Sequence, residues 1–177
     1  MKNTVILKWN PAISSYNMIR FLDDIVQNNP ESDWSIWEHE RVRKGDIFHM
    51  LKVGHGQTGI VMQGRITSDP ESGEDWSRQG RKTYYSNYKA EIMLGPDVFP
   101  LLTSHVLQDN IPDFDWFAGH SGMVLNEKQA EMLDKLWVSY LQENKAEFQS
   151  RLDLMECREM LNDQLYLSPA LQKKLFR

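Results

Sequence analysis

The chain has 177 residues, a formal net charge of −5 and a single cysteine, Cys157. This length fits one domain, or one domain with a helical extension, and it is enough to bury an ordinary core. The lone cysteine excludes an internal disulfide framework and a cysteine-rich zinc site, and no apolar run reaches membrane-spanning length. No signal-peptide pattern opens the sequence, so we expect a cytoplasmic protein without membrane association.

The first forty residues predict a strand, a helix and an ambiguous segment. Residues 4–9 (TVILKW) are a short apolar run and predict a buried strand. Ser14 or Ser15 can cap a helix that follows, with one apolar face made of Met18, Phe21, Leu22, Ile25 and Val26. Residues 28–33 form a polar break, and residues 34–40 (WSIWEHE) fit either a turn or a short strand.

The middle of the chain is rich in short strands. Gly45 and Asp46 form an entry turn, after which Ile47–Val53 and Thr58–Ile66 predict two adjacent strands with loosely alternating apolar residues. Residues 68–80 predict a loop, and residues 82–94 predict a further strand. Strands this short and numerous favour a small antiparallel or mixed barrel over a parallel βαβ sheet.

The last third of the sequence predicts mainly helices. A short helix is expected near residues 101–107, and a loop with a last strand at 116–124. Asn126 and Gln129 fit a capping box, and they begin a helix with an apolar stripe at Ala130, Leu133, Trp137, Tyr140 and Leu141. A second helical stretch is expected from about 146 to 165, and Ser168-Pro169 marks the start of a short terminal helix. These patterns divide the chain into a domain, residues 1–145, and a C-terminal helical extension, residues 146–177.

No sequence pattern indicates catalysis or a metal site. The five histidines show neither H-x-x-x-H nor H-E-x-x-H spacing, and no G-x-S-x-G, G-x-G-x-x-G or Walker A sequence occurs. We therefore predict neither an enzyme nor a metal ion or other cofactor. An enzyme such as a nuclease or amidohydrolase, built on the same fold, is retained as an alternative.

The charges are unevenly distributed. Residues 41–82 contain eight Lys or Arg against five acids, whereas residues 97–163 contain thirteen acids against five bases. One face of an acidic protein could therefore be locally basic. The alternative is that these charges are only a solvated surface.

The order of these motifs resembles that of EVE domains and other PUA-like domains, over about residues 4–140. The shared features are an opening strand that ends in Lys8 before a polar turn with proline, a tryptophan segment at 37–43, strands that end in Asp69-Pro70, and a polar loop, strand and helix from His120 onward. The sequence departs from the family in the turn WNPAIS and in lacking a basic, asparagine-rich stretch after the tryptophan segment.

This resemblance implies an α+β fold, namely a PUA-like (EVE-type) mixed β pseudobarrel with flanking helices. It also implies a concave pocket that accepts one flipped, modified base of DNA or RNA without catalysis, and hence without a cofactor. Trp9 and Trp37 are the expected walls, and the expected polar contacts are Lys8, Asn10, His49 and Ser121. The residues expected to contact the flanking phosphates are Arg41, Arg43, Arg78, Arg81 and Lys82.

A protein-interaction module is the main alternative. In that case the barrel is a scaffold whose acidic C-terminal helices bind a protein partner, and a homodimer face could consist of Leu152, Met155, Leu161 and Leu165. Salt-dependent binding of oligonucleotides would favour the base-binding hypothesis. A mass that rises with protein concentration, without such binding, would favour the interaction module.

Overall fold

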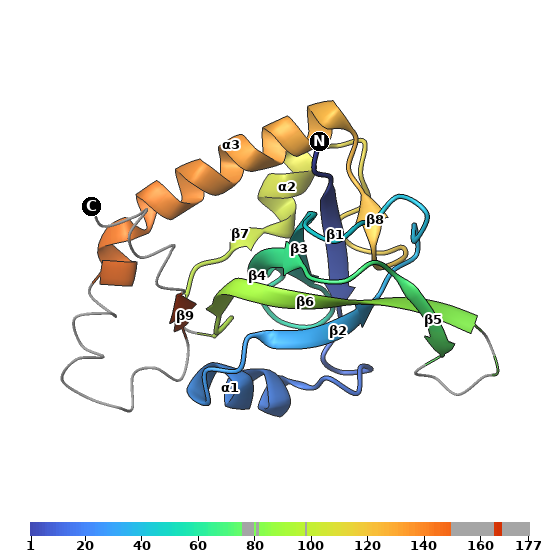
Figure 1. Cartoon of the computed structure of the whole chain (residues 1–177). Coiled ribbons are helices and arrows are strands. Elements are labelled where there is room, and N and C mark those ends of the chain that lie inside the picture. Colours follow the sequence, from blue (N-terminus) through green and yellow to red (C-terminus); the bar gives the residue numbers. More distant parts are fainter. Residues whose placement is uncertain (76–79, 81, 98, 150–164, 168–177) are drawn as a thin grey trace.

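The computed structural model describes residues 1–75, 80, 82–97, 99–149 and 165–167. These residues form one mixed sheet with helices beside it (Figure 1). The strands are β1 (Thr4–Trp9), β2 (Glu31–Ser35), β3 (Ile47–Lys52), β4 (Gly59–Ile66), β5 (Glu71–Glu74), β6 (Lys82–Leu94), β7 (Leu102–Thr103), β8 (Met123–Val124) and β9 (Leu165–Leu167). The helices are α1 (Met18–Val26), α2 (Ser104–Asn110) and α3 (Glu127–Glu143).

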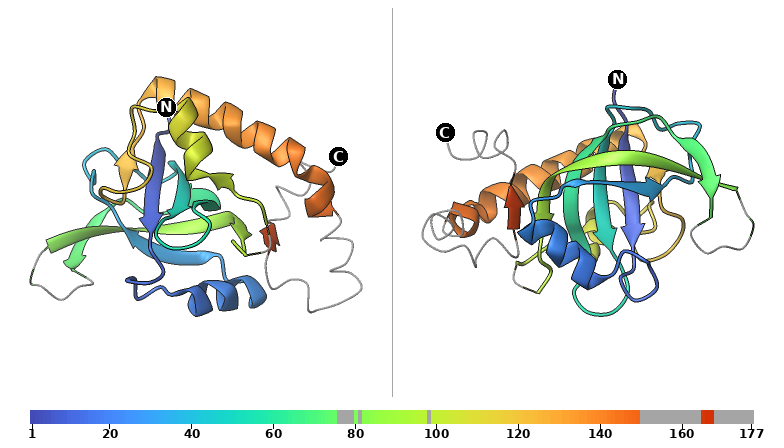
Figure 2. Two further views of the ribbon diagram at one scale, coloured as in Figure 1. Left: turned by 180° about the vertical axis from the view of Figure 1, so that it is seen from behind. Right: turned by 60° about the horizontal axis from the view of Figure 1, so that its bottom comes forward.

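The sheet has the strand order β2-β6-β4-β3-β1-β8. β1 runs parallel to β3, with Thr4 opposite Ile47, and the other pairings are antiparallel. The short strands β5 and β9 pair with β6, and β7 pairs with β4. Figure 2 shows that the sheet is strongly curled and open, so that the fold is an α+β half-barrel.

Two irregularities bend the central strands. The pairing register shifts between Met50 and Leu51 where β3 meets β4, and between Gln63 and Gly64 where β4 meets β6. A Cβ atom at Gly64 would lie 2.1 Å from the carbonyl oxygen of Lys89, so β6 approaches β4 too closely for any side chain there. Such bulges increase local twist and bend the strand that carries them, which accounts for the curl.

The helices α1 and α3 cover opposite faces of the sheet. Phe21 of α1 packs against Trp9 of β1, with ring centroids 4.9 Å apart, and Trp137 of α3 packs against His49 of β3 at 5.1 Å. His49 is paired with Ile6, three residues before Trp9, and side chains alternate between faces along a strand. Trp9 and His49 therefore point to opposite sides of neighbouring strands.

Most of the long elements match their sequence predictions. The strands predicted at 47–53 and 58–66 are adjacent and antiparallel, and the predicted strands at 4–9 and 82–94 are confirmed. The capping box at the start of α3 is also confirmed, because Asn126 Oδ1 accepts from the Gln129 amide at 2.8 Å while Gln129 Oε1 accepts from the Asn126 amide.

Several local predictions were wrong. α1 is capped by Asn17, whose Oδ1 accepts from the Arg20 amide, because Ser14 is used in a local turn that bonds the Tyr16 amide. The polar segments 31–35 and 71–74 are strands, since both pair with the long strand β6. The short helix predicted at 101–107 begins at Ser104, after the two-residue strand β7.

The C-terminal segment differs in part from the predicted helical extension. Residues 145–149 are helical, but residues 165–167 form β9, which pairs with residues 92–94 of β6. The other leucine and methionine positions predicted to form a homodimer face, and the predicted terminal helix at 168–169, lie outside the described residues. The division of the chain at residue 145 remains a prediction.

None of the helices in the described ranges has the length and apolar character needed to cross a membrane.

Candidate functional site

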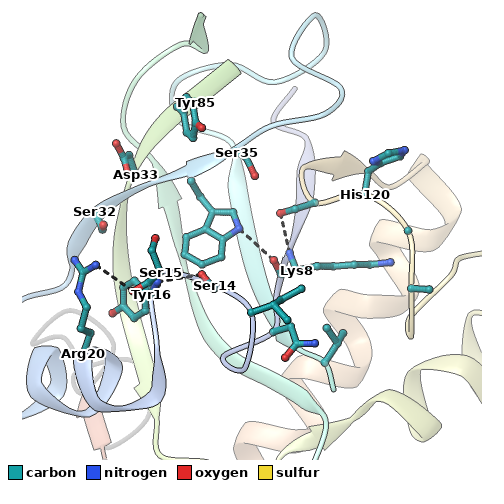
Figure 3. Close-up of a pocket in the computed structure, with 17 residues that line it drawn as sticks. Lys8, Ser14, Ser15, Tyr16, Arg20, Ser32, Asp33, Ser35, Tyr85 and His120 are labelled. Carbon is teal, nitrogen blue, oxygen red and sulfur yellow. Dashed lines mark hydrogen bonds between the residues drawn. The ribbon is translucent and has the colours of Figure 1, made fainter. Parts of the chain in front are cut away.

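A cavity of about 430 Å³ opens where β1 ends beside β2 (Figure 3). We call it the first cavity. Its walls come from β1 and the turn after it, from β2, and from the loop that precedes β8. The lining residues include Lys8, Asn10, Ser14, Tyr16, Arg20, Asp33, Trp34, Ser35, Tyr85, His120 and Ser121.

Trp34 supplies the main aromatic surface of the first cavity. Its indole Nε1 donates a hydrogen bond of 3.2 Å to the carbonyl oxygen of Lys8, and its ring meets the Tyr16 ring edge-on at 5.8 Å. The polar atom of the indole is thus already satisfied by the protein. What Trp34 offers to a ligand is its ring surface, held in a fixed orientation.

The neutral polar groups of the first cavity retain hydrogen-bonding capacity. Ser121 Oγ accepts from the Lys8 amide at 2.9 Å, which leaves its hydroxyl hydrogen to be donated. Asn10 Oδ1 accepts from the Ala12 amide at 3.1 Å, so its amide nitrogen is the group that it can offer. Asp33, from β2, adds carboxylate acceptors, and the cavity therefore combines donors with an acceptor.

The two cations at the first cavity are engaged by the protein. Lys8 Nζ donates to the carbonyl oxygen of Asp115 and lies 5.3 Å from the centre of the Phe114 ring. Burial lowers the pKa of Lys8, against the opposing effect of the Asp115 carboxylate. Arg20 donates to the Ser15 carbonyl oxygen at 3.3 Å, with its guanidinium 5.5 Å from the Tyr16 ring centre. The first cavity is therefore suited to a largely uncharged group.

Three of the six residues predicted for the pocket meet in the first cavity: Lys8, Asn10 and Ser121. Trp9 does not, and its prediction as a wall was wrong. Its side chain is only 1% exposed, it packs on Phe21, and its Nε1 donates to the carbonyl oxygen of Tyr16. Trp9 is therefore part of the core beneath α1.

His49 also lies away from the first cavity. It is 4% exposed and meets Trp137 edge-on, on the sheet face that α3 covers. Burial lowers its pKa to about 3, so the imidazole is neutral, and its Nδ1 has no hydrogen-bond partner within the described residues. The prediction of His49 as a pocket contact was wrong, because its side chain is buried against Trp137 beneath α3 and does not line the first cavity.

Trp37 lies in a neighbouring depression of about 380 Å³, which we call the second cavity. Its ring stacks on His120 with centroids 3.6 Å apart and an interplanar angle of 2°. Ser35, His120 and Ser121 line both cavities, so the two are adjacent. The prediction that Trp9 and Trp37 form walls of one cavity was therefore wrong.

The predicted phosphate-binding residues are separated in space. Lys82 lines the second cavity, whereas Arg41 and Arg43 line neither cavity. Arg41 forms an ion pair with Glu38 at 2.6 Å, and Arg43 donates to the Val42 carbonyl oxygen at 2.7 Å. Arg78 and Arg81 lie outside the described residues.

Trp34, Tyr16 and Asp33 are among the residues of the first cavity that were not predicted from the sequence. Trp34 was assigned to an ambiguous turn or strand, and the strand that presents it contains three polar residues in a row before it. The available signal was an aromatic residue in such a polar segment, because a tryptophan there is unexpected unless it packs in the core or meets a ligand. No signal distinguished Tyr16 from an ordinary turn residue.

In the part of the chain that the structure describes, no group of three or more His, Cys, Asp or Glu side chains could share a metal ion.

No protein-family model matches this chain, and no curated protein matches it. Solved structures that resemble it include a hypothetical protein from Leishmania major, which is 13% identical with a TM-score of 0.51. That match covers 79% of this chain and 98% of the other. A Pseudomonas syringae protein is 14% identical with a TM-score of 0.47, over 75% of this chain and 99% of the other. At this identity the Leishmania structure supports the fold alone.

Proposed function

We propose that this protein binds a modified nucleobase of DNA or RNA in the first cavity and catalyses no reaction. The observation that carries the proposal is the fixed Trp34 ring, with the hydrogen-bonding groups of Asn10, Ser121 and Asp33 lining the same cavity. A nucleobase has the complementary form, a flat aromatic face with a polar edge. The curled α+β sheet and the order of the sequence motifs support assigning the fold to the PUA-like pseudobarrels.

The chemistry of the first cavity supports a base over a phosphate or a sugar. Stacking on Trp34 is worth about 1–3 kcal/mol, and the donors on Asn10 and Ser121, with the acceptor on Asp33, can pair with the base edge. A volume of about 430 Å³ suits a base that carries a small substituent. A base within a duplex must leave the stack to enter, and this cost is smallest in single strands.

The proposal is tested by titrating fluorescently labelled single strands and duplexes that carry 5-methylcytosine or N6-methyladenine, beside unmodified strands. Changing Trp34→Ala should weaken binding of the preferred strand roughly 5-fold to 150-fold, since it removes the stacking surface. Trp34→Phe is the matched control, because it retains a ring and should lose much less affinity.

Thermal unfolding of both variants separates a binding effect from loss of the fold. Undiminished binding by a folded Trp34→Ala variant would contradict the proposal. If no strand binds and the mass of the protein rises with concentration, the protein-interaction module, with its acidic helices and homodimer face, is the better hypothesis.

A further inference from the structure

A base bound in the first cavity would leave the second cavity empty. The second cavity also contains Trp37, whose exposure is not explained by packing within the fold. Trp37 follows β2 directly after Ile36 and is 58% exposed. Exposed indole surface carries an unfavourable hydration free energy, which burial against a ligand would recover. A tryptophan held at the wall of a cavity in this way is a candidate contact for a further group of the ligand.

Two stacked pairs of rings line the second cavity. One pair is Trp37 with His120, and the other is His39 with Tyr84, whose centroids lie 3.5 Å apart at an interplanar angle of 11°. Each pair joins rings from segments far apart in the sequence, so the fold itself assembles them. Preassembled rings lose little rotamer freedom when a ligand stacks on them, which favours binding of a flat aromatic group.

The second cavity lies directly beside the first. Ser35, His120 and Ser121 form part of both linings, so an occupant of one cavity is next to an occupant of the other. In a nucleic acid the nearest group of the same kind is the neighbouring nucleotide. The phosphate that links the two nucleotides would then pass close to this shared wall.

The second cavity also has a cation suited to that phosphate. Lys82 is exposed and lines the cavity from the start of β6. Lys8 and Arg20, at the first cavity, are bonded to backbone carbonyl oxygens instead. The two cations at the first cavity are held by the protein, whereas Lys82 can contact a phosphate at the second. This difference matches a base pocket that lies beside a site for the neighbouring nucleotide.

We propose that the second cavity holds the nucleotide next to the one whose base enters the first cavity. The ligand is therefore a single strand with at least one nucleotide beside the recognised base, rather than a free nucleoside. The neighbouring base stacks on the ring pairs, and Lys82 contacts a phosphate. This inference rests on the proposed function.

The test compares a nucleoside with a dinucleotide, by calorimetry on the full chain. The probes are 5-methylcytidine and N6-methyladenosine, alone and joined to an unmodified neighbour. The dinucleotide should bind roughly 5-fold to 150-fold more tightly than its nucleoside, the range for one added stacked base. Tyr84→Leu and Trp37→Ala should bring this ratio of affinities toward one. Trp34→Ala should instead weaken the binding of both the nucleoside and the dinucleotide.

A matched pair of charge variants tests the phosphate contact. Lys82→Gln should flatten the dependence of log K on log salt for a short single strand by about 0.7. Lys89→Gln removes an exposed lysine of the same strand that lines neither cavity, and it should leave this slope unchanged.

The outcomes separate this inference from the proposed function. Equal affinities for nucleoside and dinucleotide would overturn the inference alone, as would ratios that Tyr84→Leu and Trp37→Ala leave intact. If neither the nucleoside nor any strand binds, the proposed function fails, and the inference fails with it.

Discussion

Trp9 and Trp37 show how two tryptophans predicted for one role occupy opposite environments. Trp9 is enclosed by Phe21 and Tyr16, whereas Trp37 is largely exposed. We expect Trp9→Ala to lower the free energy of unfolding by about 3–5 kcal/mol, because it leaves a large void in the core. Trp37→Ala should change it by no more than about 0.5 kcal/mol. Urea unfolding of the two variants measures both values, and similar losses would contradict the assignment.

His49 should make stability depend on pH. Its folded pKa of about 3 lies below the ordinary value of 6.5, because burial penalises the charged imidazole. Between these values the unfolded chain binds a proton that the folded chain does not. Stability is therefore full above about pH 6.5 and falls as the pH is lowered, by at most about 1.4 kcal/mol per pH unit.

The measurement is chemical unfolding of the wild type and of His49→Leu, between about pH 6 and pH 5, above the range in which ordinary carboxylates titrate. The variant should show a shallower loss of stability on acidification, because it removes the titrating group. The absolute stability of the variant is not the test, since the substitution also changes packing against Trp137. Parallel pH profiles would show that His49 does not control this dependence.

At the scale of elements, the close pairing of β4 with β6 depends on Gly64. A methyl group there would lie 2.1 Å from the Lys89 carbonyl oxygen and 2.8 Å from the Ala90 Cα, and both atoms belong to the paired backbone. We expect Gly64→Ala to destabilise the protein by about 1–3 kcal/mol or more, since the strands must separate to admit it. Gly73→Ala in β5 is the control, because its nearest neighbour is the Tyr85 ring at 3.2 Å, which can move. Equal thermal shifts would contradict this explanation.

The sequence was informative where an element depends on its own residues. The apolar runs of β3, β4 and β6 and the cap at Asn126 have local causes, and they were predicted. β2 and β5 were missed because they are short and polar, and their strand conformation comes from pairing with β6. Such pairing is non-local, so it leaves little pattern in the segment itself.

The candidate site was predictable only in part, for a reason that concerns strand geometry. Lys8 and Trp9 are consecutive in β1, so their side chains point to opposite faces and cannot both line one cavity. Lys8 lines the first cavity, whereas Trp9 is buried because α1 packs on the face that carries it. Which face a helix covers is decided by packing between distant segments, and the order of motifs does not contain it.

For the molecule as a whole, the position of β1 has a consequence for biosynthesis. β1 is made first, yet it lies between β3 and β8, and β8 is formed by residues 123–124. While the ribosome delivers the chain, the edge of β1 that will meet β8 therefore stays without its native partner until most of the sheet has been synthesised. Unpaired strand edges attract other chains. Translation that stalls before Met123 would leave a nascent protein whose β1 edge is unpaired and prone to aggregation. Such a chain would depend on ribosome-associated chaperones.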